Sequence, residues 1–248
     1  RWKIGCKDCM QLSTYPVSKL LDNSTQNWFM KKSIFNSVKM SLVTPSHWLE
    51  DVLKQSFLKE HKVQTIYNGV DLEVFKPTGL KKEKTILGVA SEWTERKGLA
   101  DFIELRCHLS NEYRIKLFGL TKRQIKKLPS GVEGFERTDS VAELVKEYNQ
   151  ATVFINFSQE ETMGMTTVEA IACGTPVIVY NSTALPEVVD TNSGVIVYNI
   201  HDMQEIVQAI SKIENTDYSD CHNSARKYEK SIQSKEYIEL YRSIIHEK

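Results

Sequence analysis

Two glutamates, Glu161 and Glu169, are separated by seven residues within EETMGMTTVEAIACGTPVIVY (160–180). A carboxylate accepts hydrogen bonds from two neighbouring hydroxyl groups, such as those of a ribose or a hexose. Gly164 lies between the glutamates and permits close approach of the backbone to a ligand. The apolar run that ends the stretch predicts a buried strand directly behind it. The pattern is typical of a site for an extended, hydroxyl-rich ligand at a loop-to-helix junction.

The same stretch contains a predicted helix that begins near Met165 or Thr166 and ends at Gly174. The free N–H groups and the positive dipole end of such a helix bind phosphate without a basic side chain. A phosphate between two hydroxyl-bearing rings describes a nucleotide sugar. A purely structural interpretation stays open, because Thr166-x-x-Glu169 is also a capping box and Glu161 is then a solvated loop residue.

Lys97 is a second candidate for the same ligand. It follows an apolar segment in ASEWTERKG (90–98), and a lysine there meets a diphosphate as a point charge. By itself, beside Glu95 and Arg96, it is better explained as a surface lysine.

The elements that position these residues follow from the pattern after residue 84. Ser140 and Asp202 are predicted to cap two of the helices. Six short apolar segments alternate with helical segments; they are 84–90, 114–120, 132–135, 152–158, 176–180 and 194–198. This alternation predicts an α/β fold, with a mostly parallel, doubly wound sheet covered on both faces. Ligands of such sheets bind at the carboxyl ends of the strands, where the Lys97 and Glu161 loops occur.

Residues 1–75 differ in pattern. An amphipathic helix is predicted over 16–37, strands over 40–46 and 63–69, and a helix capped by Ser46 between the strands. Two strands are too few for an independent sheet, so we expect this segment to be the tail of a preceding domain. Residues 70–84 are typical of an interdomain linker. The sequence opens without a methionine, and we expect natural residues, with any targeting signal, to precede it.

Composition excludes several classes of protein. Lys and Arg together number 32, as do Asp and Glu, so bulk charge does not favour nucleic-acid binding. No apolar run is long enough to span a membrane, and no signal peptide is visible. No G-x-G-x-x-G follows the first strand, which disfavours an oxidoreductase, and no P-loop motif occurs. The basic cluster at 122–127 is interpreted as a solvated helix face, with a membrane-surface role as the alternative.

The five cysteines are scattered, which is not typical of a secreted disulfide framework. Cys107 and Cys173 lie in apolar helical patterns and are predicted to be core residues. Cys6-x-x-Cys9 is compatible with half of a zinc site or with a redox pair, although no second ligand pair lies nearby. The sequons at Asn23, Asn156 and Asn181 are discounted as glycosylation sites.

The stretch 160–180 resembles the E-x7-E motif of retaining, nucleotide-sugar-dependent glycosyltransferases of the GT-B fold. Other stretches agree with that family in order along nearly the whole chain. The residues that carry the resemblance are Glu161, Gly164, Glu169, Ala170, Ala172, Gly174, Pro176 and Val177, with ERKGLADFIEL (95–105), TPSHWLEDVL (44–53), IYNGVDLEVFKP (66–77) and Leu185-Pro186-Glu187. The likeness is to bacterial enzymes that build capsular, exopolysaccharide or lipopolysaccharide chains.

The resemblance implies a role for each matching residue. Glu161 and Lys97 would form the catalytic pair, with Glu161 on the hydroxyls of the donor sugar and Lys97 on the diphosphate. Glu169 would bind the nucleotide ribose. The remaining donor-binding residues implied are Gly164, Met165 and Thr166 through backbone N–H groups, Arg96 as an added cation, and Phe135 near the base. Glu161 is not assigned as a covalent nucleophile.

Two departures from the family pattern stand out. The family places an arginine five residues before the lysine, where this chain has Glu92, and Arg96 is the candidate substitute. The glycine-rich loop of the family's acceptor domain is also missing from the sequence. About half of a complete enzyme is therefore expected to be absent, and the chain alone is expected to bind donor without transferring sugar.

The resemblance implies three segments: 1–75 from the acceptor-side domain, 76–232 as the Rossmann-like donor domain, and 233–248 as a helix that packs back toward the first domain. The implied partners are a nucleotide sugar and a glycan or lipid-linked acceptor, with no cofactor and no metal. A cytoplasmic enzyme is expected, with association at the inner membrane face and a homodimer as further expectations. The alternatives are a nucleotide-binding or oligomerising module, an epimerase-like enzyme, and a phosphorylase-like enzyme with a pyridoxal cofactor.

Overall fold

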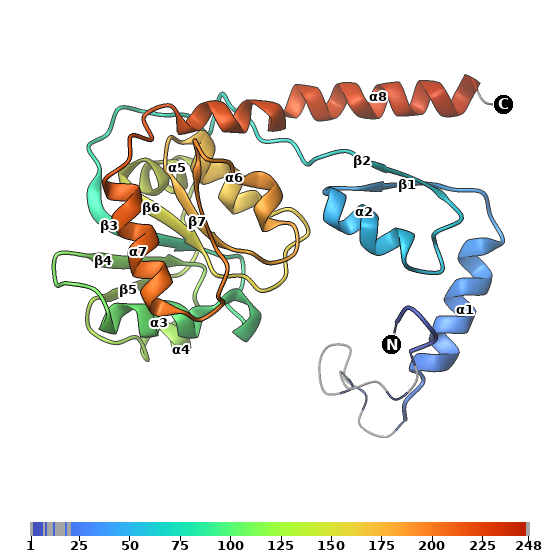
Figure 1. Ribbon diagram of the computed structural model, residues 1–248, viewed down its shortest axis with the longest axis horizontal. Helices are drawn as coiled ribbons and strands as arrows, with labels where there is room; N and C mark the ends of the chain where they lie inside the picture. Colours follow the sequence, from blue (N-terminus) through green and yellow to red (C-terminus); the bar gives the residue numbers. More distant parts are fainter. Residues whose placement is uncertain (1, 7, 9–11, 13–17, 19–20, 247–248) are drawn as a thin grey trace. The chain divides into compact units, whose positions relative to one another are not determined.

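The computed structural model describes residues 2–6, 8, 12, 18 and 21–246 (Figure 1). The chain divides into two compact units, the first ending at Ile66 and the second beginning at Tyr67. The division therefore falls before the boundary at residue 75 that the sequence suggested. The reason is local: Val70 forms a parallel bridge with Glu229, and the ring of Phe75 packs edge-on against Tyr148. The predicted linker is thus built into the second unit.

The first unit is small. Its strands pair in parallel, and its elements are α1 (Ser24–Asn36), β1 (Ser41–Thr44), α2 (His47–Lys54) and β2 (Lys62–Thr65). Of the helix predicted over 16–37, the described residues show helix only from Ser24, and residues 16–17 and 19–20 lie outside the description. The predicted cap of α2 is confirmed, because Ser46 Oγ accepts a hydrogen bond from the Leu49 N–H at 3.2 Å.

The second unit contains the predicted sheet. All neighbouring strands run parallel in the order β5-β4-β3-β6-β7-β8. The strands are β3 (Glu83–Val89), β4 (Arg114–Phe118), β5 (Val132–Phe135), β6 (Ala151–Asn156), β7 (Val177–Tyr180) and β8 (Gly194–Val197). This is the doubly wound order: the chain adds strands on one side of β3, then crosses to β6 on its other side. The fold class predicted from the sequence is confirmed.

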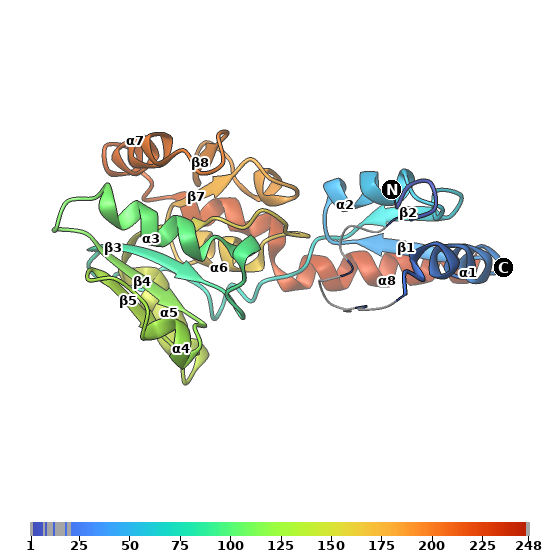
Figure 2. The same ribbon diagram turned by 90° about the horizontal axis from the view of Figure 1, so that it is seen from below.

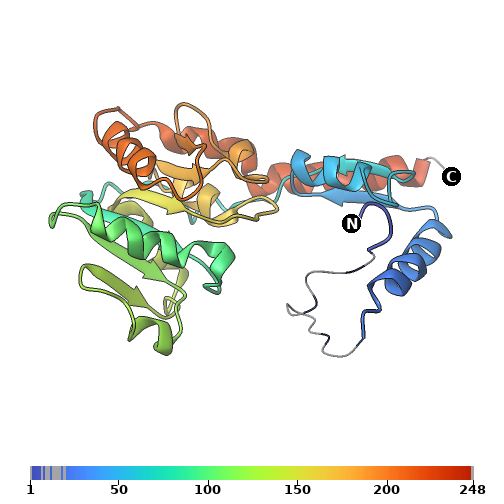
Figure 3. The ribbon, with the colours of Figure 1, turned by 60° about the horizontal axis from the view of Figure 1, so that its bottom comes forward.

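Helices cover both faces of this sheet (Figures 2 and 3). The helices of this unit are α3 (Leu99–Cys107), α4 (Lys122–Ile125), α5 (Val141–Gln150), α6 (Met165–Ala172), α7 (Met203–Glu214) and α8 (Lys230–His246), with 3-10 helices η1 (Glu95–Lys97), η2 (Leu185–Val188) and η3 (Cys221–Tyr228). Helix α8 runs away from the sheet and covers neither face (Figure 1). Successive strand residues alternate between the two cores: Ile86 packs with α3 and α7, while Leu87 packs with α5 and α6. The near-continuous apolar strands reflect burial on both faces.

Several local predictions can be compared with the structure. Ser140 and Asp202 cap α5 and α7, as predicted. Cys173 is buried, but the prediction for Cys107 was wrong: this last residue of α3 is exposed, because at about 100° per residue it lies on the side of the helix opposite the buried Leu105. In α8, Leu240 is the buried residue.

Candidate functional site

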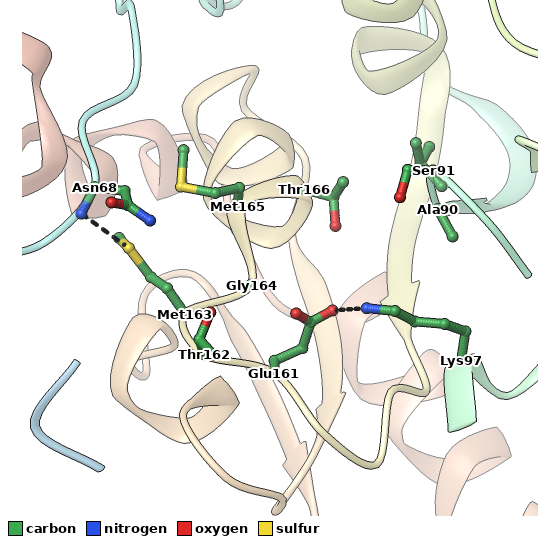
Figure 4. Close-up of a pocket in the computed structure, with 11 residues that line it drawn as sticks. Asn68, Ala90, Ser91, Lys97, Glu161, Thr162, Met163, Gly164, Met165 and Thr166 are labelled. Carbon is green, nitrogen blue, oxygen red and sulfur yellow. Dashed lines mark hydrogen bonds and ion pairs between the residues drawn. The ribbon is translucent and has the colours of Figure 1, made fainter. Parts of the chain in front are cut away.

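A pocket lies at the switch point of the sheet, where the connections of β3 and β6 leave in opposite directions. Strands β3 and β6 are hydrogen-bonded neighbours, and each is followed by loops that line the pocket. This crevice at the carboxyl ends is where open α/β sheets bind ligands. The lining residues are Asn68, Val89, Ala90, Ser91, Lys97, Glu161, Thr162, Met163, Gly164, Met165 and Thr166 (Figure 4).

Helix α6 begins at the pocket, at Met165, as predicted. Its N-cap is Gly164, which has a left-handed φ of 85°, and no side chain caps the helix. The capping-box interpretation of Thr166 and Glu169 is therefore wrong, because Thr166 is already inside the first turn. Within the described chain, the N–H groups of Met165 and Thr166 make no backbone hydrogen bond. These two donors and the positive end of the helix are thus available to an anion.

Gly164 is favoured mainly by its backbone conformation and also by the space around it. Its φ of 85° lies in the left-handed region, and a Cβ at this position would lie 2.7 Å from Leu185 Cδ2. The first turn of α6 is also held by a side-chain hydrogen bond: the Asn156 amide, at the end of β6, donates to Thr167 Oγ1 at 3.0 Å. The asparagine side chain of the sequon at Asn156 is thus buried and hydrogen-bonded within the protein. The Asn156 contact therefore ties the first turn of α6 to the end of β6.

Lys97 and Glu161 meet inside the pocket. Lys97 Nζ lies 2.5 Å from Glu161 Oε1, and the two side chains are 29% and 19% exposed (Figure 4). The backbone N–H of Glu161 donates to Thr183 Oγ1 at 2.9 Å, which fixes the glutamate loop to the loop after β7. Gly98, with a φ of 75°, turns the chain directly after Lys97 into α3. The loops after β3 and β6 therefore contribute one charge each to the same site.

Glu169 lies one turn farther along α6 and does not line the pocket. It is half-buried, and its Oε2 accepts a hydrogen bond from the Tyr148 hydroxyl on α5 at 3.0 Å. Burial raises the pKa of Glu169 to about 6, and the Tyr148 hydrogen bond acts in the opposite direction. Burial, followed by the nearby Glu169 charge, raises the pKa of Tyr148 well above its ordinary value. The carboxylate is therefore held at a fixed position in a poorly solvated environment.

Arg96 and Phe135 are not brought to the pocket. Arg96 forms an ion pair with Glu160 at 2.5 Å, and both side chains are 58% exposed, so the pair contributes little to stability. Phe135 ends the edge strand β5, and its ring stacks on Phe118 with centroids 4.7 Å apart. Neither residue lines the pocket in this structure, because the Arg96 side chain pairs with Glu160 and the Phe135 ring stacks on Phe118.

One wall of the pocket comes from residues that were not predicted to belong to the site. Asn68 was not among the predicted site residues, yet it lines the pocket, and its backbone N–H donates to the Met163 sulfur at 3.2 Å (Figure 4). Ser91 and Thr162 also contribute hydroxyl groups to the lining. These three residues lie close together because of the order of the strands and the path of the 67–70 segment. The spacing of residues along the sequence predicts neither the strand order nor that path.

Two negative findings concern the described part of the chain. Its His, Cys, Asp and Glu residues form no cluster of three that could hold a metal ion, and Cys9 of the proposed Cys6 pair lies outside it. Among the described helices, none combines the length and apolarity needed to cross a bilayer.

The sequence matches the family described as "Glycosyl transferases group 1" over residues 83–215, which is more than half of its length. The chain belongs to the group 1 glycosyltransferases. The resemblance inferred from the motif is confirmed at the level of this family, and the epimerase-like, phosphorylase-like and non-enzymatic alternatives are not favoured. The matched segment contains Lys97, Glu161 and Glu169, together with every strand of the parallel sheet.

Bacterial glycosyltransferases are among the curated relatives. The alpha-monoglucosyldiacylglycerol synthase of Streptococcus pneumoniae is 26% identical over 219 residues, covering 78% of this chain and 49% of the relative. Two other relatives are named for colanic acid biosynthesis and for the O-antigen chain. The chain spans about half the length of the curated relatives it matches.

Solved structures share the fold. A sucrose-phosphate synthase from Thermosynechococcus elongatus superimposes with a TM-score of 0.76 at 19% identity, covering 96% of this chain and 66% of that one. Anabaena HepE, solved with UDP and glucose, superimposes with a TM-score of 0.69 at 17% identity, covering 87% and 67% of the two chains. The fold is thus that of the GT-B glycosyltransferases.

Proposed function

We propose that this chain binds a nucleoside diphosphate sugar in the switch-point pocket. The whole protein would transfer the sugar to a hydroxyl of a glycan or lipid-linked acceptor, with retained anomeric configuration, as an E-x7-E enzyme. The observation that carries the proposal is the Lys97–Glu161 pair beside the free N-terminus of α6. The family membership and the UDP complex of HepE support the class of donor.

The diphosphate would lie against the start of α6. Met165 and Thr166 would donate their backbone N–H groups to phosphate oxygens, and Lys97 would approach from the β3 side. A lysine ammonium has three N–H donors, so Lys97 can hold a phosphate oxygen while it keeps its contact with Glu161. This combination of a helix terminus and a point charge suits an anionic group.

The two glutamates would recognise hydroxyl groups at opposite ends of the donor. Glu161, inside the pocket, would accept hydrogen bonds from hydroxyls of the transferred sugar. Glu169, one turn farther along α6, would accept from the ribose, and its second oxygen would keep the Tyr148 contact. Because the pKa of Glu169 is raised to about 6, this role predicts weaker donor binding as pH falls through that value.

Transfer requires the nucleoside diphosphate to leave with increasing negative charge. Lys97 and the α6 N-terminus would stabilise that charge from fixed positions, so that little reorganisation is needed as the charge develops. We therefore propose that donor binding does not require a divalent metal. Glu161 would orient the sugar through its hydroxyls rather than attack it.

Calorimetric titration with UDP, GDP and ADP tests the proposal directly. We expect one of them to bind with or without EDTA, and Lys97→Ala to weaken it by roughly 10- to 100-fold, the range for a lost charge-assisted hydrogen bond. Lys146→Ala, which removes an exposed lysine on α5, is the matched control and should leave binding unchanged. Failure of all three nucleotides to bind, or equal affinity of both variants, would contradict the proposal.

A further inference from the structure

The pocket has a second wall on the side facing away from the charged pair. Asn68 forms this wall, across the pocket from Lys97 (Figure 4). Within the described chain, its side-chain amide makes no hydrogen bond, although the backbone N–H of the same residue does. An amide presents both donors and an acceptor, so a half-buried one without a protein partner is available to a ligand.

Asn68 is held in place by the segment around it. Its backbone N–H donates to the Met163 sulfur at 3.2 Å, inside the glutamate loop. On one side, the ring of Tyr67 packs edge-on against Tyr228, with centroids 5.2 Å apart. On the other side, the Val70 N–H donates to the Tyr228 carbonyl at 2.7 Å. The backbone of Asn68 is therefore positioned before any ligand binds, which lowers the entropic cost of using its side chain.

The charges in the pocket limit what this wall can accept. Among the described lining residues, only Lys97 and Glu161 are charged, and they pair with each other. Lys97 would also hold the diphosphate, so no cation remains for a carboxylate on the sugar. Glu161 would repel such a group, because the carboxylate of the sugar would be a second negative charge in a partly buried site and would have no cation of its own.

We propose, on the basis of the proposed function, that Asn68 contacts the transferred sugar and that the pocket selects donor sugars without a carboxylate. The neutral amide hydrogen-bonds a hydroxyl or an acetamido group equally well, so both hexoses and N-acetylhexosamines fit. A uronic acid donor does not, because it would bring an anion to a site whose cation is already engaged. Asn68 is thus a specificity-determining residue of the donor site.

The test uses calorimetry to compare three ligands that share one nucleotide, chosen as the nucleotide that the chain binds. If that nucleotide is UDP, the ligands are UDP, UDP-glucose and UDP-glucuronate. With GDP, the series becomes GDP, GDP-mannose and GDP-mannuronate; with ADP, it becomes ADP, ADP-glucose and ADP-glucuronate. We expect the wild-type chain to bind the neutral donor at least about tenfold more tightly than the uronate, a factor that one uncompensated charge readily supplies. Asn68→Ala should weaken the neutral donor about fivefold, as for one lost neutral hydrogen bond, and leave the free nucleotide unchanged.

Asn68→Lys supplies the missing cation and should narrow or reverse the preference by improving uronate binding. Asn223→Ala, an exposed asparagine in η3, is the control and should change none of the affinities. The backbone N–H that contacts Met163 is present in every variant, and thermal unfolding checks that each remains folded. Wild-type affinities that are equal for both sugars, or an Asn68→Ala variant that binds the neutral donor normally, would overturn the proposal. Absence of binding by every nucleotide would overturn the proposed function as well, while nucleotide binding without sugar discrimination would overturn this proposal alone.

Discussion

Glu169→Gln is expected to make the protein more stable and a poorer nucleotide binder. Glu169 is half-buried against α5, and burial raises its pKa from 4.5 to about 6. The raised pKa means that the fold favours the neutral carboxyl, so ionisation near neutral pH destabilises the native state. A glutamine removes the charge and still accepts the hydrogen bond from the Tyr148 hydroxyl. The substitution therefore removes the free-energy cost of burying the Glu169 charge while it keeps the size of the side chain and its contact with Tyr148.

The magnitude follows from the pKa shift. A change from 4.5 to about 6 corresponds to about 2 kcal/mol, at 1.36 kcal/mol per pKa unit. Because the folded-state pKa is the higher one, the stabilisation from the neutral form is complete below about pH 4.5 and is lost as pH rises through about 6. The advantage of Glu169→Gln should thus be small near pH 4.5 and reach about 2 kcal/mol at pH 8.

Urea unfolding of both proteins at these two pH values measures the effect. Glu239→Gln, at an exposed position on α8, is the control and should show no comparable pH-dependent difference. Calorimetry on the same samples should show weaker nucleotide binding for Glu169→Gln, since the ribose hydroxyls lose a charged acceptor. A variant that is less stable than the wild type at pH 8, or a stability difference that does not change with pH, would refute the reasoning.

Two further substitutions distinguish residue 164, which should affect both stability and nucleotide binding, from residue 140, which should affect stability alone. Gly164→Ala should cost about 1–3 kcal/mol of unfolding free energy and weaken nucleotide binding at least about tenfold, because its φ of 85° is strained for alanine and its Cβ would meet Leu185. Normal stability and affinity, measured by urea unfolding and calorimetry, would show that the turn tolerates a side chain. Ser140→Ala should cost about 1 kcal/mol through loss of the 3.2 Å cap to the Glu143 N–H, with nucleotide affinity unchanged. A change in affinity would mean that α5 and the pocket are coupled.

Much of the fold could be predicted because its signals are local. Apolar segments that are buried on both faces read as continuous hydrophobic runs, and Ser140 and Asp202 mark helix starts through their own side chains. The left-handed glycine at 164 and the helix that begins at Met165 follow from the same short stretch. The helix predicted over 16–37 matched less well, since the described residues are helical only from Ser24.

The candidate site was predictable in part. The motif identified Glu161, and the stretch 95–105 identified Lys97; the structure brings their side-chain charges to 2.5 Å although the residues lie far apart in sequence. The sequence did not reveal that Glu169 points to Tyr148 outside the pocket, or that Arg96 pairs with Glu160 at the surface. Asn68 was not predicted, because nothing in the residues next to it distinguishes a structural asparagine from one that contacts a ligand.

The sequence alone determined the family, the parallel sheet and the start of the phosphate-binding helix, since periodicity, caps and glycine conformations depend on neighbouring residues. Only the tertiary structure decided which side chains share the pocket. The order β5-β4-β3-β6-β7-β8 sets the loops after β3 and β6 side by side, and the anchored 67–70 segment brings Asn68 to the opposite wall. Those contacts arise from strand pairing across the sheet, where distance in space is independent of distance along the chain.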